Sequence, residues 1–295
     1  MPRYWRWVFV ALALACMLWL LLAQWNEIRH LEWELHPGLM LLASLALVAL
    51  FFLDALGWHL ILRALGADTD ARSSIRTWLL SSLGRYLPGA VWGYVGRIAM
   101  STEQGIPAAT TVLALYLETL LLCGAAISAG LPAVALAMDF PLGGGTVVLL
   151  AVLLALLMHP RLLGLMRYLP GAIGRAFAAA ALPSARRMFA VYLYYVLFWA
   201  AFGGAFLAFV AALQPIPEGA ALPIAASMGL SFAAGLVAVF APGGIGVRES
   251  ALYLLLLPYM PAPACLLVAI GSRIWIMAGE AISVALVMAF FRTRR

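Results

Sequence analysis

Two stretches of the sequence place proline, glycine and arginine together within apolar surroundings. The first reads GRYLPGAVWGYVGR over residues 84–97, and the second reads APGGIGVRES over residues 241–250. Glycine lets backbone N–H groups approach an anion closely, and the guanidinium fork of arginine matches two phosphate oxygens at once. A helix that restarts after such a break directs the positive end of its dipole to the same place. The two stretches therefore predict a binding site for a phosphate-bearing anion.

The proline and glycine residues of the two stretches interrupt apolar runs that would otherwise continue as helices. Unsatisfied backbone is too costly to face lipid, so a break at membrane depth is tolerated only where it is buried in protein or lines a wet cavity. The alternative is that each Pro-Gly pair marks an ordinary loop between two helices. The predicted backbone breaks are Pro88, Gly89, Gly93, Pro242, Gly243, Gly244 and Gly246.

Charged side chains inside apolar runs are expensive and indicate either function or buried ion pairs. Arg273 and Glu280 share one helix face about 10 Å apart, too far to pair with each other. We expect Arg273 to pair with Glu249, Glu118 or Asp54, and the carboxylates to pair with Arg248 or Arg97. For Asp54, which lies alone on its apolar run, a role in helix packing is favoured. The predicted substrate-binding residues are Arg85, Arg97, Arg248, Glu249 and Arg273, and the predicted charge-balancing or proton-accepting residues are Glu118 and Glu280.

The composition defines the class of protein that holds these residues. Of the 295 residues, 66% are hydrophobic and only 10% are charged, which is too apolar for a soluble core. The three cysteines lie in three different apolar runs without metal-ligand spacing, and the four histidines are scattered. We therefore expect an all-α polytopic membrane protein with no metal, no cofactor and no nucleophile-and-base set for enzymatic catalysis.

A bilayer needs about 20 apolar residues per helix. This criterion predicts six full spans, at residues 6–24, 38–62, 107–130, 141–158, 188–212 and 264–291, and two interrupted elements, at 77–100 and 222–257. We interpret residues 1–295 as one membrane domain, with a first half at 6–158, a cytoplasmic linker at 159–187 and a second half at 188–291. The linker carries five arginines and is predicted to form a helix on the membrane surface.

The distribution of arginine predicts the orientation of the chain. Arginines cluster before the first span, after the second, in the linker and at the C-terminus, so the positive-inside rule places both termini in the cytoplasm. The two interrupted elements must then open towards opposite faces. Interrupted segments in corresponding positions of two halves are typical of inverted-repeat transporters. Whether each element is a re-entrant hairpin or a pair of fuller crossings stays open, with the re-entrant form favoured for the first.

The two stretches, with Gly105-Ile106-Pro107 after the first, resemble the transmembrane-region family of lysylphosphatidylglycerol synthase/flippases and their stand-alone relatives. The resemblance implies a membrane domain that moves a lipid; members have been connected with aminoacylated phospholipids, hopanoids and polyprenyl-linked glycans. The soluble aminoacyl-transferring domain of the family is not found, so synthase activity is not expected. Many relatives place Glu-Arg where this chain has Glu118-Thr119. The matching positions are Arg85, Pro88, Gly89, Gly93, Arg97, Pro242, Gly243, Gly244, Gly246, Arg248 and Glu249.

The residues and the resemblance together predict a flippase-like transporter in the bacterial inner membrane. Its substrate is expected to be an anionic, phosphate-bearing phospholipid or polyprenyl-linked lipid. The alternative is a non-catalytic scaffold or partner subunit for a lipid-modifying or envelope-glycan enzyme. Besides lipid and bilayer, the partners considered are a second copy of the chain and an enzyme of lipid synthesis; no nucleic-acid partner is expected.

Overall fold

The computed structural model describes residues 35–86, 91–137, 158–179, 182–238 and 246–290, together with Gly244 and five isolated positions between residues 145 and 156. All regular structure within these residues is helical, with no strand among them. The all-α class predicted from the sequence is therefore confirmed for the described part of the chain.

Four long apolar helices could each cross a bilayer. They are α3 (Pro37–Ala64), α6 (Ala108–Ala137), α10 (Ala185–Ala211) and α13 (Ala262–Phe290). They confirm the spans predicted at 38–62, 107–130, 188–212 and 264–291. The span predicted at 6–24 lies outside the described residues. Of the span predicted at 141–158, only the five isolated positions and residue 158 are described.

Both predicted interruptions are present between shorter helices. The first broken element consists of α4 (Ala71–Ser82), the 3₁₀ turn η1 (Leu83–Tyr86) and α5 (Trp92–Glu103). The second consists of α11 (Ala221–Val237) and α12 (Val247–Leu256). Each pair of arms packs together. The first element begins at Ala71, six residues before the predicted start, because Asp70 caps α4 by accepting a hydrogen bond from the Ser73 N–H at 3.4 Å.

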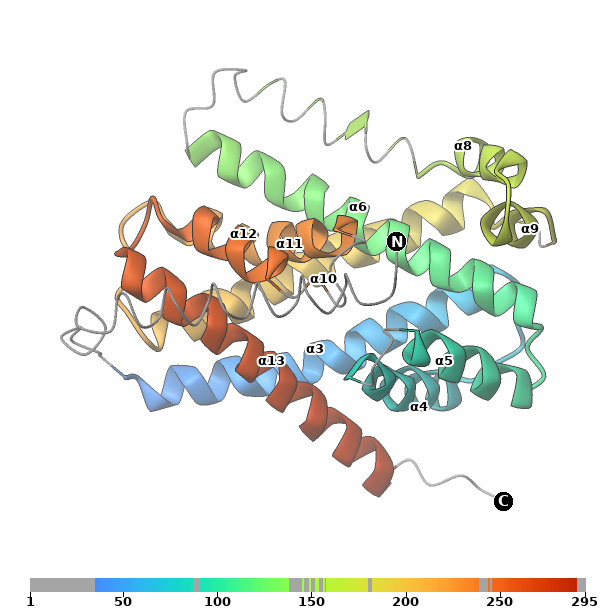
Figure 1. The fold of residues 1–295 in the computed structure, drawn as a ribbon, viewed down its shortest axis with the longest axis horizontal. Helices are drawn as coiled ribbons and strands as arrows, with labels where there is room; N and C mark the ends of the chain where they lie inside the picture. Colours follow the sequence, from blue (N-terminus) through green and yellow to red (C-terminus); the bar gives the residue numbers. More distant parts are fainter. Residues whose placement is uncertain are drawn as a thin grey trace, which may run out of the picture.

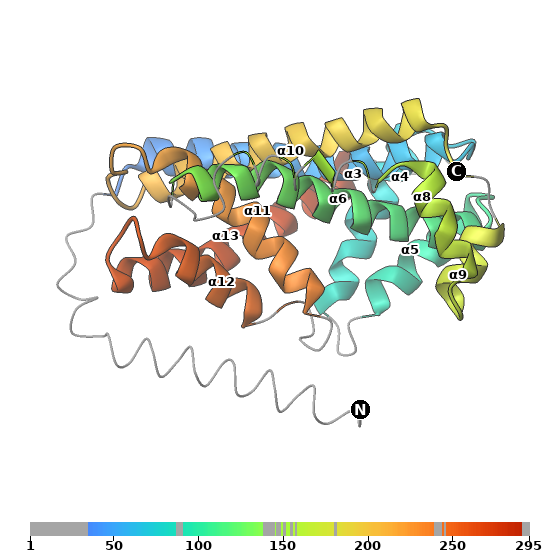
Figure 2. The same cartoon turned by 90° about the horizontal axis from the view of Figure 1, so that it is seen from above.

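The long helices pack around α10, which contacts α3, α6 and α11. Helix α13 crosses α3 and also packs against α12 and α4 (Figure 1). Seen from above, α10 runs along one side of the molecule and α12 lies on the opposite side (Figure 2). Trp58, Tyr195 and Phe206 are the largest fully buried side chains of this core. The arrangement brings α3, both arms of the first broken element, α6 and α13 around one group of charges.

The linker forms three short helical pieces, α8 (Pro160–Leu163), η2 (Gly164–Tyr168) and α9 (Ala172–Ala179). They lie at one end of the molecule, where α9 packs against α6 (Figure 1). Leu165, Tyr168 and Leu169 are exposed beside Arg161 and Arg167, which also point away from the core. This mixture of exposed apolar and basic side chains is the composition expected of a helix that lies on a membrane surface.

Candidate functional site

Gly84 and Gly93 bring the two arms of the first broken element into backbone contact. A Cβ atom at Gly84 would lie 2.7 Å from the Gly93 Cα. A Cβ atom at Gly93 would lie 3.1 Å from the Ser81 carbonyl oxygen of the preceding arm. The first of these distances is shorter than any real side-chain contact, so Gly84 can only be glycine at this separation of the arms.

Gly235 and Gly244 make the equivalent contact in the second broken element. A Cβ atom at Gly244 would lie 2.9 Å from the Gly235 carbonyl oxygen, and Gly244 has φ +66°, which favours glycine. A Cβ atom at Gly235 would lie 3.1 Å from the Cβ of Arg248 on α12. In the second element, a glycine of α11 therefore contacts a glycine of the segment between α11 and α12.

The two glycine pairs have the same spacing in the sequence. Gly84 and Gly93 are nine positions apart, as are Gly235 and Gly244, and an arginine follows the second glycine of each pair by four positions. These arginines are Arg97 and Arg248. The Pro-Gly comparison of the two stretches does not reveal the roles of Gly84 and Gly235. The shared spacing of glycine, glycine and arginine is the signal that could have identified both.

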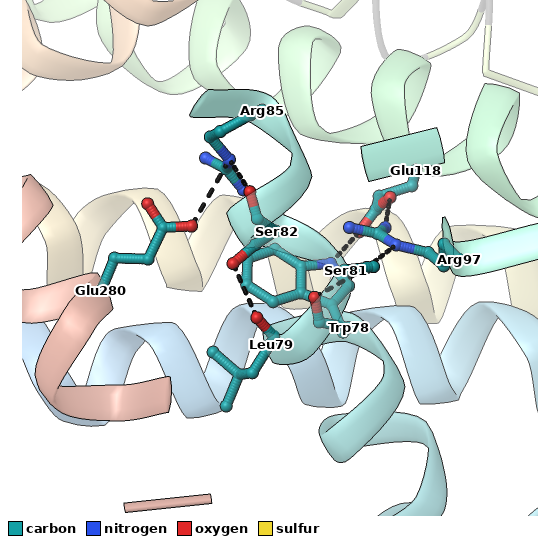
Figure 3. A network of polar contacts seen from close by, with 8 residues as sticks. All are labelled: Trp78, Leu79, Ser81, Ser82, Arg85, Arg97, Glu118 and Glu280. Carbon is teal, nitrogen blue, oxygen red and sulfur yellow. Dashed lines mark hydrogen bonds and ion pairs between the residues drawn. The ribbon is translucent and has the colours of Figure 1, made fainter. Parts of the chain in front are cut away.

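Arg97 lies at the centre of a buried polar network (Figure 3). Its guanidinium donates to Glu118 Oε2 at 2.6 Å through NH1 and to Ser81 Oγ at 3.0 Å through Nε. Trp78 Nε1 donates to the other Glu118 oxygen at 2.5 Å. The same guanidinium lies over the Trp58 and Trp78 rings, 4.9 and 5.2 Å from their centroids. The predicted pairing of Arg97 with an intramembrane carboxylate is confirmed, and the partner is Glu118.

Arg85 joins the first broken element to α13. Its Nε lies 3.4 Å from Glu280 Oε1 and donates to the Ser82 carbonyl oxygen at 3.1 Å (Figure 3). The Arg85 side chain is 46% exposed, whereas that of Glu280 is 1% exposed. The sequence predicts Arg248 or Arg97 as the partner of Glu280. Among the described residues the prediction is wrong: Arg85 pairs with Glu280, because the arm carrying Arg85 packs beside α13 and Arg97 pairs with Glu118.

Glu249 connects the second broken element to α13. Its Oε2 accepts a hydrogen bond from the Gly246 N–H at 2.7 Å, which satisfies a free donor at the start of α12. Its Oε1 lies 3.6 Å from Arg273 NH1, so Glu249 is the partner of Arg273 among the three candidates predicted. Glu249 is buried and the Arg273 side chain is 28% exposed.

Arg248 lies in the first turn of α12, beside the break. Its NH2 donates to the Met228 sulfur at 3.2 Å, and its guanidinium lies 5.5 Å from the Phe232 ring centroid. Met228 and Phe232 both belong to α11, so Arg248 spans the two arms of its own element.

The structure therefore brings the predicted charges into two groups. Arg85, Arg97, Glu118 and Glu280 lie around the first break, and Arg248, Glu249 and Arg273 lie around the second. Within the described residues, no three His, Cys, Asp or Glu side chains are grouped so as to hold a metal ion. Of the predicted backbone breaks, Pro88, Gly89, Pro242 and Gly243 lie outside the described residues.

Apolar helices long enough to cross a bilayer, together with two interrupted elements whose charges are paired in the interior, define a multi-pass membrane protein. The chain belongs to the family described as the lysylphosphatidylglycerol synthase TM region, whose model matches residues 7–279. The resemblance found in the two glycine-rich stretches is thus confirmed over most of the chain. No curated protein matched the sequence.

Proposed function

We propose that this protein is a transporter that moves an anionic, phosphate-bearing lipid between the leaflets of the bilayer. Membership of a family related to lipid synthases and flippases supports a role in lipid handling. We propose transport rather than catalysis, and the bacterial inner membrane with both termini in the cytoplasm as the location. The lipid is a phospholipid or a polyprenyl-linked phosphate.

The observation that carries the proposal is the form of the two ion pairs made by α13. In each, a partly exposed arginine reaches a buried carboxylate: Arg85 reaches Glu280 at 3.4 Å, and Arg273 reaches Glu249 at 3.6 Å. Both distances are longer than the 2.7–2.9 Å typical of a charge-assisted hydrogen bond. A phosphate that approaches from the exposed side can therefore replace the carboxylate as the partner of the arginine. In each pair the carboxylate neutralises the arginine while no lipid is bound, which supports a role in headgroup binding.

Arg97 takes a different role in this proposal. Its pair with Glu118 is short, both side chains are buried, and two tryptophan rings lie against the guanidinium. Releasing Arg97 to a substrate would leave a buried carboxylate without its cation, which is strongly unfavourable. We therefore assign Arg97 and Glu118 to holding α5 against α6, and Arg85, Arg248 and Arg273 to binding the headgroup.

The proposed cycle uses the two broken elements in turn. The headgroup phosphate displaces Glu280 from Arg85 at the first break, then passes to Arg248 and Arg273 at the second, while the acyl or prenyl tails stay in lipid. The common glycine spacing supports an inverted repeat in which the two breaks face opposite leaflets. Each glycine contact lets the arms of its element lie close enough to present the arginine beside the break.

The test is lipid translocation in proteoliposomes, measured by the accessibility of fluorescent headgroups for anionic phospholipids and polyprenyl phosphates. We expect wild-type protein to move one lipid class and Arg248→Ala to move none. Arg248→Lys should restore part of the rate, because it keeps the charge but loses the bidentate fork. Arg63→Ala is the matched control, since Arg63 is an exposed arginine whose partner at 3.4 Å, Asp68, is also exposed.

Wild-type rates in folded Arg248→Ala would contradict this assignment. No movement of any lipid by folded wild-type protein would instead favour the scaffold function, in which the same ion pairs only fix the packing of the helices.

A further inference from the structure

Asp54, in the middle of α3, is a third carboxylate beside the first break. Its charge interacts with those of Arg85, Arg97, Glu118 and Glu280. Each of these two arginines already pairs with one of the two glutamates. The group thus contains three carboxylates and two guanidinium groups. With every member ionised, it carries one negative charge in excess.

The contacts of Asp54 do not compensate that excess charge. Its Oδ1 is buried and, among the described residues, accepts no hydrogen bond. The sequence favours a packing ion pair for Asp54, but within the described residues the structure gives it no arginine within salt-bridge distance, because Arg85 and Arg97 reach the glutamates instead. An ionised carboxylate with a buried oxygen that accepts no hydrogen bond is unfavourable.

Two other buried polar groups near Asp54 also lack hydrogen-bond partners within the described part of the chain. Trp58 lies one helical turn further along α3 and is fully buried, and its Nε1 has no acceptor. Tyr195 on α10 is fully buried, its hydroxyl has no hydrogen-bond partner among the described residues, and the charge of Asp54 acts on that hydroxyl. That hydroxyl packs against α3, since a Cβ atom at Gly57 would lie 2.7 Å from it. Several polar atoms at this contact between α3 and α10 therefore have no hydrogen-bond partner among the described residues.

We propose that Asp54 is a proton-binding site. The carboxylate takes one proton from water and becomes a neutral carboxyl group, which removes the excess charge and supplies a hydrogen-bond donor. The groups that face it are Arg85 of η1, Arg97 of α5, Glu118 of α6, Glu280 of α13, and Tyr194 and Tyr195 of α10.

The surroundings favour a proton over a metal cation. Hard cations require several oxygen ligands. Both oxygens of Glu118 already accept hydrogen bonds, from Arg97 and Trp78, and Trp58 offers an N–H donor rather than an oxygen. A proton needs only the one free carboxylate oxygen that Asp54 provides.

Proton binding at Asp54 is coupled to binding of the lipid headgroup; this part of the inference rests on the proposed transport function. A phosphate that displaces Glu280 from Arg85 takes the Arg85 cation away from Glu280, and the charges of Glu280 and Asp54 repel each other. Binding of the anionic headgroup thus favours proton uptake. Proton release, in turn, favours return of Glu280 to Arg85 and expulsion of the lipid.

The first experiment tests proton binding without transport, by infrared spectroscopy of the full chain in lipid as a function of pH. Wild-type protein should show a protonated-carboxyl band that disappears as pH rises. Asp54→Asn should lack the band, Asp54→Glu should retain one, and Asp68→Asn, which changes an exposed carboxylate, should leave it unchanged. Carbon-13 labelling of aspartate, of which the chain has four, should shift the wild-type band even if Asp54→Asn fails to fold.

Three results would overturn the proposal: no such band at any pH, a band that survives in folded Asp54→Asn, or a band insensitive to aspartate labelling. A band that changes with sodium concentration at constant pH would show that Asp54 binds a metal cation instead of a proton.

The second experiment measures lipid movement under an imposed pH gradient. Wild-type rates should depend on the gradient, and Asp54→Asn should lose that dependence while Asp68→Asn keeps it. A titrating band without any lipid movement would refute the transport function and leave the proton site standing. Lipid movement that is independent of the gradient in wild-type protein would refute the coupling and leave transport standing.

Discussion

The two broken elements share a backbone arrangement and differ in the direction of their ion pairs. In both, two glycines nine positions apart come into contact, and an arginine follows the second glycine by four positions. In the first element, Arg97 holds Glu118 on the long helix that follows it in the chain. In the second, the charges are exchanged: Glu249 of the element holds Arg273 on the following long helix.

This exchange of charge accompanies a difference in how tightly each element is fixed. The Arg97–Glu118 pair is 2.6 Å long and both side chains are buried, whereas the Glu249–Arg273 pair is 3.6 Å long and its arginine is partly exposed. A short buried pair resists separation, and a longer pair with an exposed member can exchange partners. The comparison therefore identifies the first element as anchored through α5 and the second as the more easily rearranged.

The largest effect is expected when the short pair loses its carboxylate. Glu118→Gln leaves the buried Arg97 without its paired carboxylate, which should lower the free energy of unfolding by about 3–5 kcal/mol. The measurement is thermal or denaturant unfolding in detergent micelles. The double variant Arg97→Met with Glu118→Leu should recover most of the loss, because it removes both charges. A loss below about 1 kcal/mol in Glu118→Gln would show that the first element is not anchored by this pair.

A smaller effect is expected at the equivalent position of the second element. Glu249→Ala removes the acceptor of the Gly246 N–H and the partner of Arg273, and should cost about 1.5–3 kcal/mol in the same unfolding experiment. Glu249→Gln keeps an acceptor for the N–H and should cost less. If Glu249→Ala destabilised the protein more than Glu118→Gln, the order of anchoring that we infer would be reversed.

The glycine contacts can be tested against each other within the first element. Gly84→Ala places a Cβ atom against the backbone of Gly93, and we expect a loss of about 1–3 kcal/mol together with separation of the arms. Gly93→Ala, whose nearest contact would be 3.1 Å from the Ser81 oxygen, should cost less. Unfolding measurements give the stability, and a cross-link between cysteines placed on α4 and α5 reports the separation. Equal stability of Gly84→Ala and wild type would contradict the close contact.

The sequence predicted the long helices well because a bilayer demands long apolar runs, and α3, α6, α10 and α13 each satisfy that demand without interruption. It also predicted an interruption in each of the two shorter elements, and the described helices end and begin again on either side of the Pro-Gly positions. It failed at Glu280, where spacing along one helix cannot show which neighbouring helix supplies the cation. It also missed Asp54 as a site, because an unpaired carboxylate is recognised only when the partners of every nearby arginine are known.

The smallest effect is expected for a glycine of α5 that makes no close contact. It shows whether the first element needs the Gly84–Gly93 contact or only glycine as such. Gly96 lies on α5 between Gly93 and Arg97, but a Cβ atom there would meet no atom of the described residues within 4 Å. Because glycine inside a helix is about 0.5–1 kcal/mol less favourable than alanine, Gly96→Ala should leave the protein equally or slightly more stable. Unfolding and lipid-movement assays run beside Gly84→Ala provide the comparison. Loss of lipid movement in a stable Gly96→Ala protein would mean that this face of α5 approaches another surface during the proposed transport cycle. The first element could then no longer be regarded as the fixed one.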